Sequence, residues 1–122
     1  MKLFLILGAI NAGLAVILGA FGAHGLEGKL SARMLDVFKT GVQYHMYHAI
    51  GLLVIGILIG KWPGSTLLTG AGWAMFAGIV LFSGSLYVLS NTGISKLGII
   101  TPFGGLAFII GWVLVVMAVI KA

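Results

Sequence analysis

The segment Gln43–His48 (QYHMYH) holds most of the side chains in this sequence whose types and spacing could do chemistry. His45 and His48 are three residues apart, and that spacing places both on one face of a helix. Tyr44 and His48 are four residues apart and can also touch. Two or three neutral imidazoles can bind copper, zinc or haem iron.

Two interpretations of this segment are open. In the first, the side chains form a structural hydrogen-bond network with tyrosines at headgroup level, because an unpaired polar group in hydrocarbon costs several kcal/mol. In the second, they form a small-molecule, quinone, haem or metal site. The chain has no cysteine, and the histidine pair is not part of an HExxH motif. We therefore expect no metal ligands, no cofactor and no catalytic residues, with haem or metal binding as the alternative.

The composition decides the class of protein that carries this segment. Of 122 residues, 61% are hydrophobic and only 7% are charged, and the mean hydropathy is +1.22. A soluble domain carries about 25% charged residues. The composition therefore excludes soluble, disordered and nucleic-acid-binding proteins, and it predicts an integral membrane protein whose first partner is the lipid bilayer.

Four uncharged apolar stretches supply the elements that must position the polar segment. Each is about long enough for a helix to cross a bilayer core, and none shows the alternation of a barrel strand. The first stretch is also longer than the apolar core of a signal peptide, which has about 7–15 residues, and its length therefore favours a retained span over a cleaved signal. The sequence predicts an all-α, multi-pass membrane protein: a compact antiparallel four-transmembrane-helix bundle in one domain, residues 1–122. The expected spans are residues 3–23, 42–60, 67–89 and 100–120.

The connection between the first two spans is longer and more polar than the others. Within residues 26–39, apolar side chains recur at helical spacing, with Lys29, Arg33 and Asp36 on the opposite side. This pattern predicts a short interfacial amphipathic helix that starts near Ser31. Fused to the second span it would exceed one bilayer crossing, so we expect a bend near Thr40–Gly41.

An up-down-up-down bundle gathers polar side chains at one end. Asn11 is the exception, since it lies near the middle of the first span, where we expect it to bond a neighbouring backbone group or hydroxyl. The candidate site at the polar end consists of His24, Tyr44, His45, Tyr47, His48, Ser85, Tyr87 and Thr101.

Small residues recur in steps of three and four along the spans. That spacing keeps a seam facing a neighbouring helix and lets backbones approach closely. The predicted packing residues are Gly8, Ala12, Ala15, Gly19, Gly22, Gly56, Gly60, Gly70, Ala74, Ala77, Gly84, Gly104 and Gly111.

Four motifs in this chain resemble one known family. They are Gly19–Leu26 (GAFGAHGL), Tyr44–Ala49 (YHMYHA), Gly84–Tyr87 (GSLY), and Thr101–Gly105 (TPFGG) followed by Gly111–Trp112. Together they resemble the domain-of-unknown-function 423 family, the transmembrane-protein-256-like proteins, over nearly the whole chain. The resemblance implies a small four-span protein of the bacterial cytoplasmic membrane, with relatives in eukaryotes. It implies no reaction and no catalytic residues.

These observations favour a non-enzymatic role. The small-residue seams, short loops and lack of buried charge favour a structural or accessory protein that packs with itself or with a larger membrane complex. Binding of a small molecule, quinone, haem or metal at the His/Tyr-rich face is the alternative. A proton-coupled transporter is disfavoured, because it needs a carboxylate inside the membrane and the only acids, Glu27 and Asp36, lie in the interfacial segment.

Overall fold

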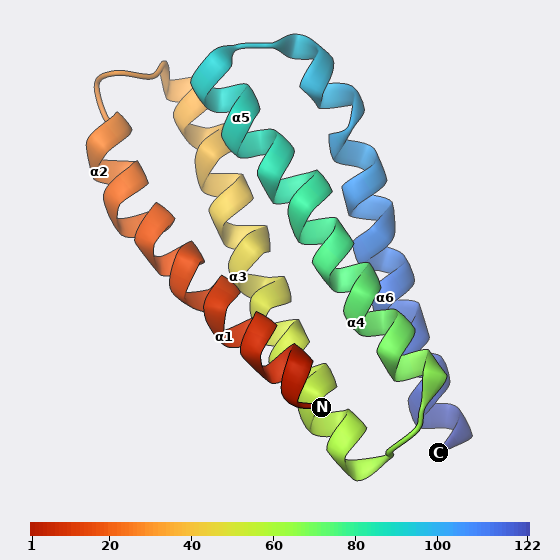
Figure 1. Cartoon of the computed structure of the whole chain (residues 1–122). Coiled ribbons are helices and arrows are strands. Elements are labelled where there is room, and N and C mark those ends of the chain that lie inside the picture. Colours follow the sequence, from red (N-terminus) through yellow and green to blue (C-terminus); the bar gives the residue numbers. More distant parts are fainter.

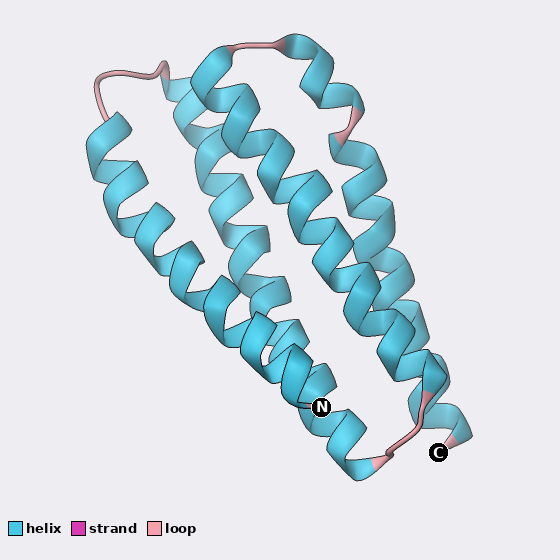
Figure 2. Cartoon of the chain, in the orientation of Figure 1, coloured by secondary structure: helices cyan, strands magenta, loops and turns pink.

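Each apolar stretch forms a helical rod, and the four rods lie side by side in alternating directions (Figure 1). The structure, a computed structural model, describes residues 1–122, with the side chain of Ala23 excepted. Within that part of the chain every rod is helical and the connections are short (Figure 2). The elements are α1 (Lys2–Ile17), the π-helical turn η1 (Leu18–Gly22), α2 (Ala23–Leu26), α3 (Ala32–Lys61), α4 (Thr66–Gly78), the π-helical turn η2 (Ile79–Ser83), α5 (Gly84–Thr92), the 3-10 turn η3 (Ser95–Ile99) and α6 (Thr101–Lys121).

The rods begin and end at residues with a local reason to do so. The Ser31 hydroxyl accepts a hydrogen bond from the Met34 amide at 3.2 Å, and Ser65 accepts one from Leu68 at 3.2 Å. These contacts satisfy amides that the first turn of a helix leaves free. At the C-terminal end of α5, Gly93 takes a φ of +71°, the left-handed conformation that favours glycine, and the helix ends there.

The four rods, residues 2–26, 32–61, 66–92 and 95–121, are long and apolar enough to cross a membrane. Their mean hydropathies over the most apolar windows lie between 1.6 and 2.6. The predicted four-span bundle is confirmed. Three rods extend one to five residues beyond the expected span at either end, while the second begins at residue 32, ten residues before its expected start.

The segment before the second span differs from the prediction. There is no separate interfacial helix and no break near Thr40–Gly41, because α3 runs without interruption from Ala32 to Lys61. Its 30 residues extend about 45 Å, which matches a bilayer of about 40–45 Å that includes the headgroups. The charged first turns of α3 therefore reach headgroup level as part of the spanning helix. The Ser83 hydroxyl also donates to the Gly41 carbonyl at 2.7 Å and holds this part of α3 against the third rod.

The third rod contains a π-helical turn at Ile79–Ser83. A π turn adds one residue to a helical turn and so redirects the side chains that follow it. Here Ser83 is fully buried against α3, while the preceding Phe82 points between α3 and α6. Ser83 therefore contacts α3, while the adjacent Phe82 lies between α3 and α6.

Glycines opposite aromatic rings make the core close-packed. A Cβ atom on Gly72 would overlap the Phe4 ring, and one on Gly78 would overlap the Phe108 ring. A Cβ atom on Gly104 would overlap the backbone of Leu81 and Phe82. The buried core cluster consists of Phe4, Leu52, Ile55, Ala71, Met75, Ile79 and Phe108.

On most rods the predicted small residues contact a neighbouring helix. On the third rod a different face is buried from the one that the predicted small residues form. Gly8 and Gly56 lie against the opposing helix in the α1–α3 pair, and Gly111 lies against α4. On the third rod, Ala77 is exposed and Gly84 has no neighbouring helix in contact. The buried small residues there are Ala71, Gly72 and Gly78 instead. Gly72 faces Phe4 of α1 and Gly78 faces Phe108 of α6, so this rod buries a wider face than a single seam.

Candidate functional site

The candidate polar side chains predicted to gather at one end of the bundle form separate groups instead of one site. The structure brings His45 together with Tyr87 and Asn11, and it brings His48 together with Trp112. Both histidines are almost fully buried, with 4% and 5% of their surfaces exposed. Their hydrogen bonds therefore decide what chemistry they can do.

His45 stands in a directional chain of hydrogen bonds that joins α1, α3 and α5. The Asn11 amide nitrogen donates to the Leu7 carbonyl at 2.8 Å, so the Asn11 oxygen is left to accept. His45 Nε2 lies 2.9 Å from that oxygen and must carry the proton that it donates. His45 Nδ1 then accepts from the Tyr87 hydroxyl at 2.9 Å. Every member is satisfied with a neutral imidazole in the Nε2–H form.

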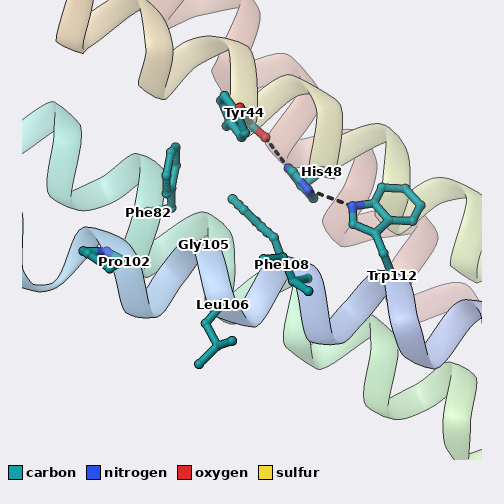
Figure 3. A pocket seen from close by; sticks show the side chains of 9 residues that line it. Tyr44, His48, Phe82, Pro102, Gly105, Leu106, Phe108 and Trp112 are labelled. Carbon is teal, nitrogen blue, oxygen red and sulfur yellow. Dashed lines mark hydrogen bonds between the residues drawn. The ribbon is translucent and has the colours of Figure 1, made fainter.

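His48 links α3 to α6 through the opposite form of the ring. Its Nδ1–H donates to the Tyr44 carbonyl at 2.7 Å, since a carbonyl can only accept. Its Nε2 accepts from the Trp112 indole N–H at 3.1 Å. The imidazole also stacks on the Phe108 ring, with centroids 3.5 Å apart and planes 8° apart. Figure 3 shows both hydrogen bonds of His48.

The other predicted site residues lie elsewhere. Ser85 and Thr101 bond each other at 2.6 Å and join the third and fourth rods. The Tyr47 hydroxyl accepts from Gln43 at 2.7 Å on an exposed side of α3. His24 is exposed near the end of α2. The eight predicted residues therefore do not converge on one point.

A groove opens between α3, η2 and α6 beside His48 (Figure 3). It has a volume of about 650 Å³ and no charged residue in its lining. Five of its nine lining residues carry an aromatic or imidazole ring, and at Gly105 the wall is formed by the backbone alone. The lining residues are Tyr44, His48, Phe82, Pro102, Gly105, Leu106, Phe108, Ile109 and Trp112.

The aromatic rings of the groove have a defined arrangement. The Tyr44 centroid lies 6.2 Å from His48 and 6.5 Å from Phe108, at interplanar angles of 14° and 22°. Because the two distances are nearly equal, the Tyr44 ring lies beside the stacked pair and not above it. Phe82 completes the wall, with its centroid 4.8 Å from Tyr44 and 5.6 Å from Phe108.

Sequence reasoning missed four participants in these groups. Asn11 was set apart from the polar end, although a polar group in an apolar span must find a partner and the antiparallel α1–α3 pair offers His45. Phe82 and Phe108 are ordinary apolar residues of their spans, and no local pattern marks them as groove walls. Trp112 was noted only as part of a motif, and its indole N–H is the signal that it would need a partner if buried.

Among the described residues, no group of three or more His, Cys, Asp or Glu side chains could hold a metal ion. Both ring nitrogens of His45 and of His48 are engaged by protein groups, so binding a metal there would require breaking one of these bonds. The groove, and not the histidine nitrogens, is the open feature of this region.

Comparisons with known proteins place the chain among bacterial membrane proteins. The family model described as "Protein of unknown function (DUF423)" matches residues 18–105. The chain is 66% identical over 121 residues to the UPF0382 membrane protein YwdK of Bacillus subtilis, covering 99% of this chain and 98% of that protein. It is 54% identical over 121 residues to the UPF0382 membrane protein SAB0533 of Staphylococcus aureus, with the same coverage. No solved structure matches.

Proposed function

This chain belongs to the DUF423 family, and we propose that it is a small non-enzymatic protein of the bacterial cell membrane that binds a lipid-soluble molecule in the groove between α3 and α6. That it is a multi-pass membrane protein follows from its four apolar helices and from its relatives. The binding role is inferred from the groove.

The groove itself is the observation that carries the proposal. Its volume of about 650 Å³ lies within the range of about 300–1,000 Å³ that is typical of small-molecule sites. Its lining is mostly apolar and aromatic, with a tyrosine and a histidine among the walls, which is the usual composition of such sites. A molecule that enters this groove from within the bilayer has to be soluble in lipid.

The hydrogen bonds of the histidines support binding without catalysis. A general base needs a free nitrogen within reach of the proton it removes. His48 lines the groove, but both of its nitrogens are engaged, by the Tyr44 carbonyl and by Trp112. His45 is likewise engaged on both sides and does not line the groove. This arrangement also favours a function without a metal or haem bound at the histidines.

An accessory role in a larger membrane assembly is the second candidate. It is favoured by the low burial of the outer rods, since 22% of the most apolar window is buried in the first rod and 22% in the fourth, against 39% in each of the other two. Their outward faces meet lipid or another protein. Native mass spectrometry in mild detergent distinguishes the candidates: a partner or second copy at fixed stoichiometry supports the accessory role.

Extraction of the purified protein tests the binding role. The wild type should carry a small lipid-soluble molecule in a fixed ratio, measured by mass spectrometry of the organic extract. Gly105→Leu should lower that ratio at least tenfold, because a side chain at Gly105 would enter the groove, where the nearest atoms of Phe82 are 3.8 Å from a Cβ. Gly13→Leu is the matched control, because Gly13 is exposed and has open space around it. Equal amounts of bulk membrane lipid in all three proteins would contradict the proposal.

A further inference from the structure

We infer that the groove takes a neutral molecule with a planar ring, a carbonyl acceptor that binds the Tyr44 hydroxyl, and an apolar tail, which is the chemistry of a quinone. This inference rests on the proposed binding function and names the class of its ligand. Four features of the groove carry it: the shape of its walls, its one free donor, the absence of charge in its lining, and its extent through the membrane.

The walls suit a flat ring. Aromatic or imidazole rings from all three bordering segments line the groove: Tyr44 and His48 from α3, Phe82 from η2, and Phe108 from α6. Aromatic faces and edges gain energy from a stacked or edge-on ring beyond the area that they bury. A flexible acyl chain gains no such preference. The backbone of Gly105 leaves room for a ring to approach α6 closely.

The polar atoms of the groove select a hydrogen-bond acceptor. The side chains of His48 and Trp112 are already bonded to each other, and His48 also to the Tyr44 carbonyl. Tyr44 is 38% exposed, and its hydroxyl has no hydrogen-bond partner among the described groups. In a hydrocarbon environment this free O–H favours a ligand that offers a carbonyl oxygen.

The absence of charge in the lining narrows the class further. None of the nine lining residues is charged, so a carboxylate or ammonium on the ligand would meet no counter-ion. Burying an unpaired charge in a membrane interior costs several kcal/mol. The ligand is therefore neutral, which excludes ionised carboxylates and organic cations at this depth.

The groove extends through about one leaflet. From Pro102 to Trp112 the helix α6 rises about 15 Å, half of a hydrocarbon core of about 30 Å. Pro102 lies near the start of α6 and Trp112 near its middle. Leu106 and Ile109 line the groove and are exposed, as are Val113 and Val116 beyond them. This strip offers an apolar surface along which a tail can lie.

Fluorescence quenching tests the inference with Trp112 as the reporter. Trp62→Phe and Trp73→Phe leave Trp112 as the only tryptophan, and the protein is placed in phosphatidylcholine nanodiscs. A short-tailed benzoquinone is then titrated, since quinones quench indole emission at close range. We expect saturable quenching. Adding Tyr44→Phe, which removes only the hydroxyl, should raise the half-saturation concentration about 2- to 13-fold, the value of one hydrogen bond of about 0.5–1.5 kcal/mol.

Matched variants separate the possible outcomes. Tyr47→Phe should leave the half-saturation unchanged, because Tyr47 lies outside the groove and bonds Gln43. Gly105→Leu in the reporter should abolish saturation. Circular dichroism melting curves report whether each variant is folded, and Tyr44→Phe removes no hydrogen bond within the chain.

The inference and the proposed function fail in different ways. Linear quenching that is the same in every variant would overturn the quinone assignment, and so would saturation that Tyr44→Phe does not change. Neither result bears on the proposed binding function, which is tested by the extraction experiment because that experiment detects a bound molecule of any class. A phospholipid alone in that extract would overturn both.

Discussion

His45 and His48, three residues apart on α3, are held in opposite neutral tautomers: His45 carries its proton on Nε2 and His48 carries it on Nδ1. In each ring the assignment follows from a partner that can only accept, the Asn11 oxygen for His45 and the Tyr44 carbonyl for His48. The two rings thereby connect α3 to different helices, and neither leaves a ring nitrogen free toward the groove beside His48.

We predict that nitrogen NMR spectra will show these two tautomers. In detergent micelles, the long-range 1H–15N spectrum of ring-labelled protein should contain one Nε2–H and one Nδ1–H imidazole from the buried histidines. His24, which is exposed, serves as the internal reference for an averaging ring. Two buried rings of the same tautomer, or rapid averaging in either, would contradict the assigned hydrogen bonds.

We predict that Asn11→Leu will lower the free energy of unfolding by about 1–2 kcal/mol, because it leaves the His45 Nε2–H buried without an acceptor. The triple variant Asn11→Leu, His45→Leu, Tyr87→Phe should be more stable than Asn11→Leu alone, since it leaves no unpaired polar group. Steric trapping in micelles measures both values. Gln43→Leu is the control, with an expected change within about 0.5 kcal/mol because Gln43 is exposed. A triple variant less stable than the single one would contradict this reasoning.

Adjacent glycines on α6 should differ sharply in their tolerance of a methyl group. Gly104→Ala would place a Cβ atom on the backbone of Leu81 and Phe82, so the two rods must separate. We expect a loss of about 1–3 kcal/mol in the free energy of unfolding, as for overpacked cores. Gly105→Ala has its nearest neighbour at 3.8 Å and should be neutral within about 0.5 kcal/mol. Equal effects of the two substitutions would show that the helices are not in contact at Gly104.

The continuity of α3 can be tested by hydrogen exchange. We predict that the amides near Thr40 and Gly41 exchange as slowly as their helical neighbours, because α3 is unbroken there and Ser83 binds the Gly41 carbonyl. Mass spectrometry of the exchanged protein in nanodiscs, resolved to single residues by electron-transfer fragmentation, measures the rates. Fast exchange confined to these two amides would restore the bend that was expected from the length of the segment.

Much of the fold is predictable from sequence because hydropathy and chain length fix the spans. The interfacial segment was mispredicted because the expected length limit was that of the hydrocarbon core. A 30-residue helix that reaches headgroup level keeps Arg33 and Asp36 outside the core without a bend.

The pairing of the histidines shows where sequence reasoning reaches its limit. Residues three apart on a helix share a face, yet they still point about 60° apart because each residue turns the helix by about 100°. On α3 that angle is enough to turn His45 toward Asn11 and Tyr87, and His48 toward Trp112. Which neighbour lies in each direction depends on how the rods pack, and no local pattern contains that information. The same holds for the groove walls at Phe82 and Phe108.

The indole N–H signals of the three tryptophans test the central claim most directly. A 1H–15N spectrum of delipidated protein is recorded in micelles before and after addition of the lipid-soluble fraction extracted from the wild-type protein. The groove account predicts that the Trp112 indole signal shifts and saturates, while the signal of Trp73, which lies outside the groove lining, stays in place. A Trp112 signal that does not move, or three signals that move together without saturation, would contradict a binding site in this groove.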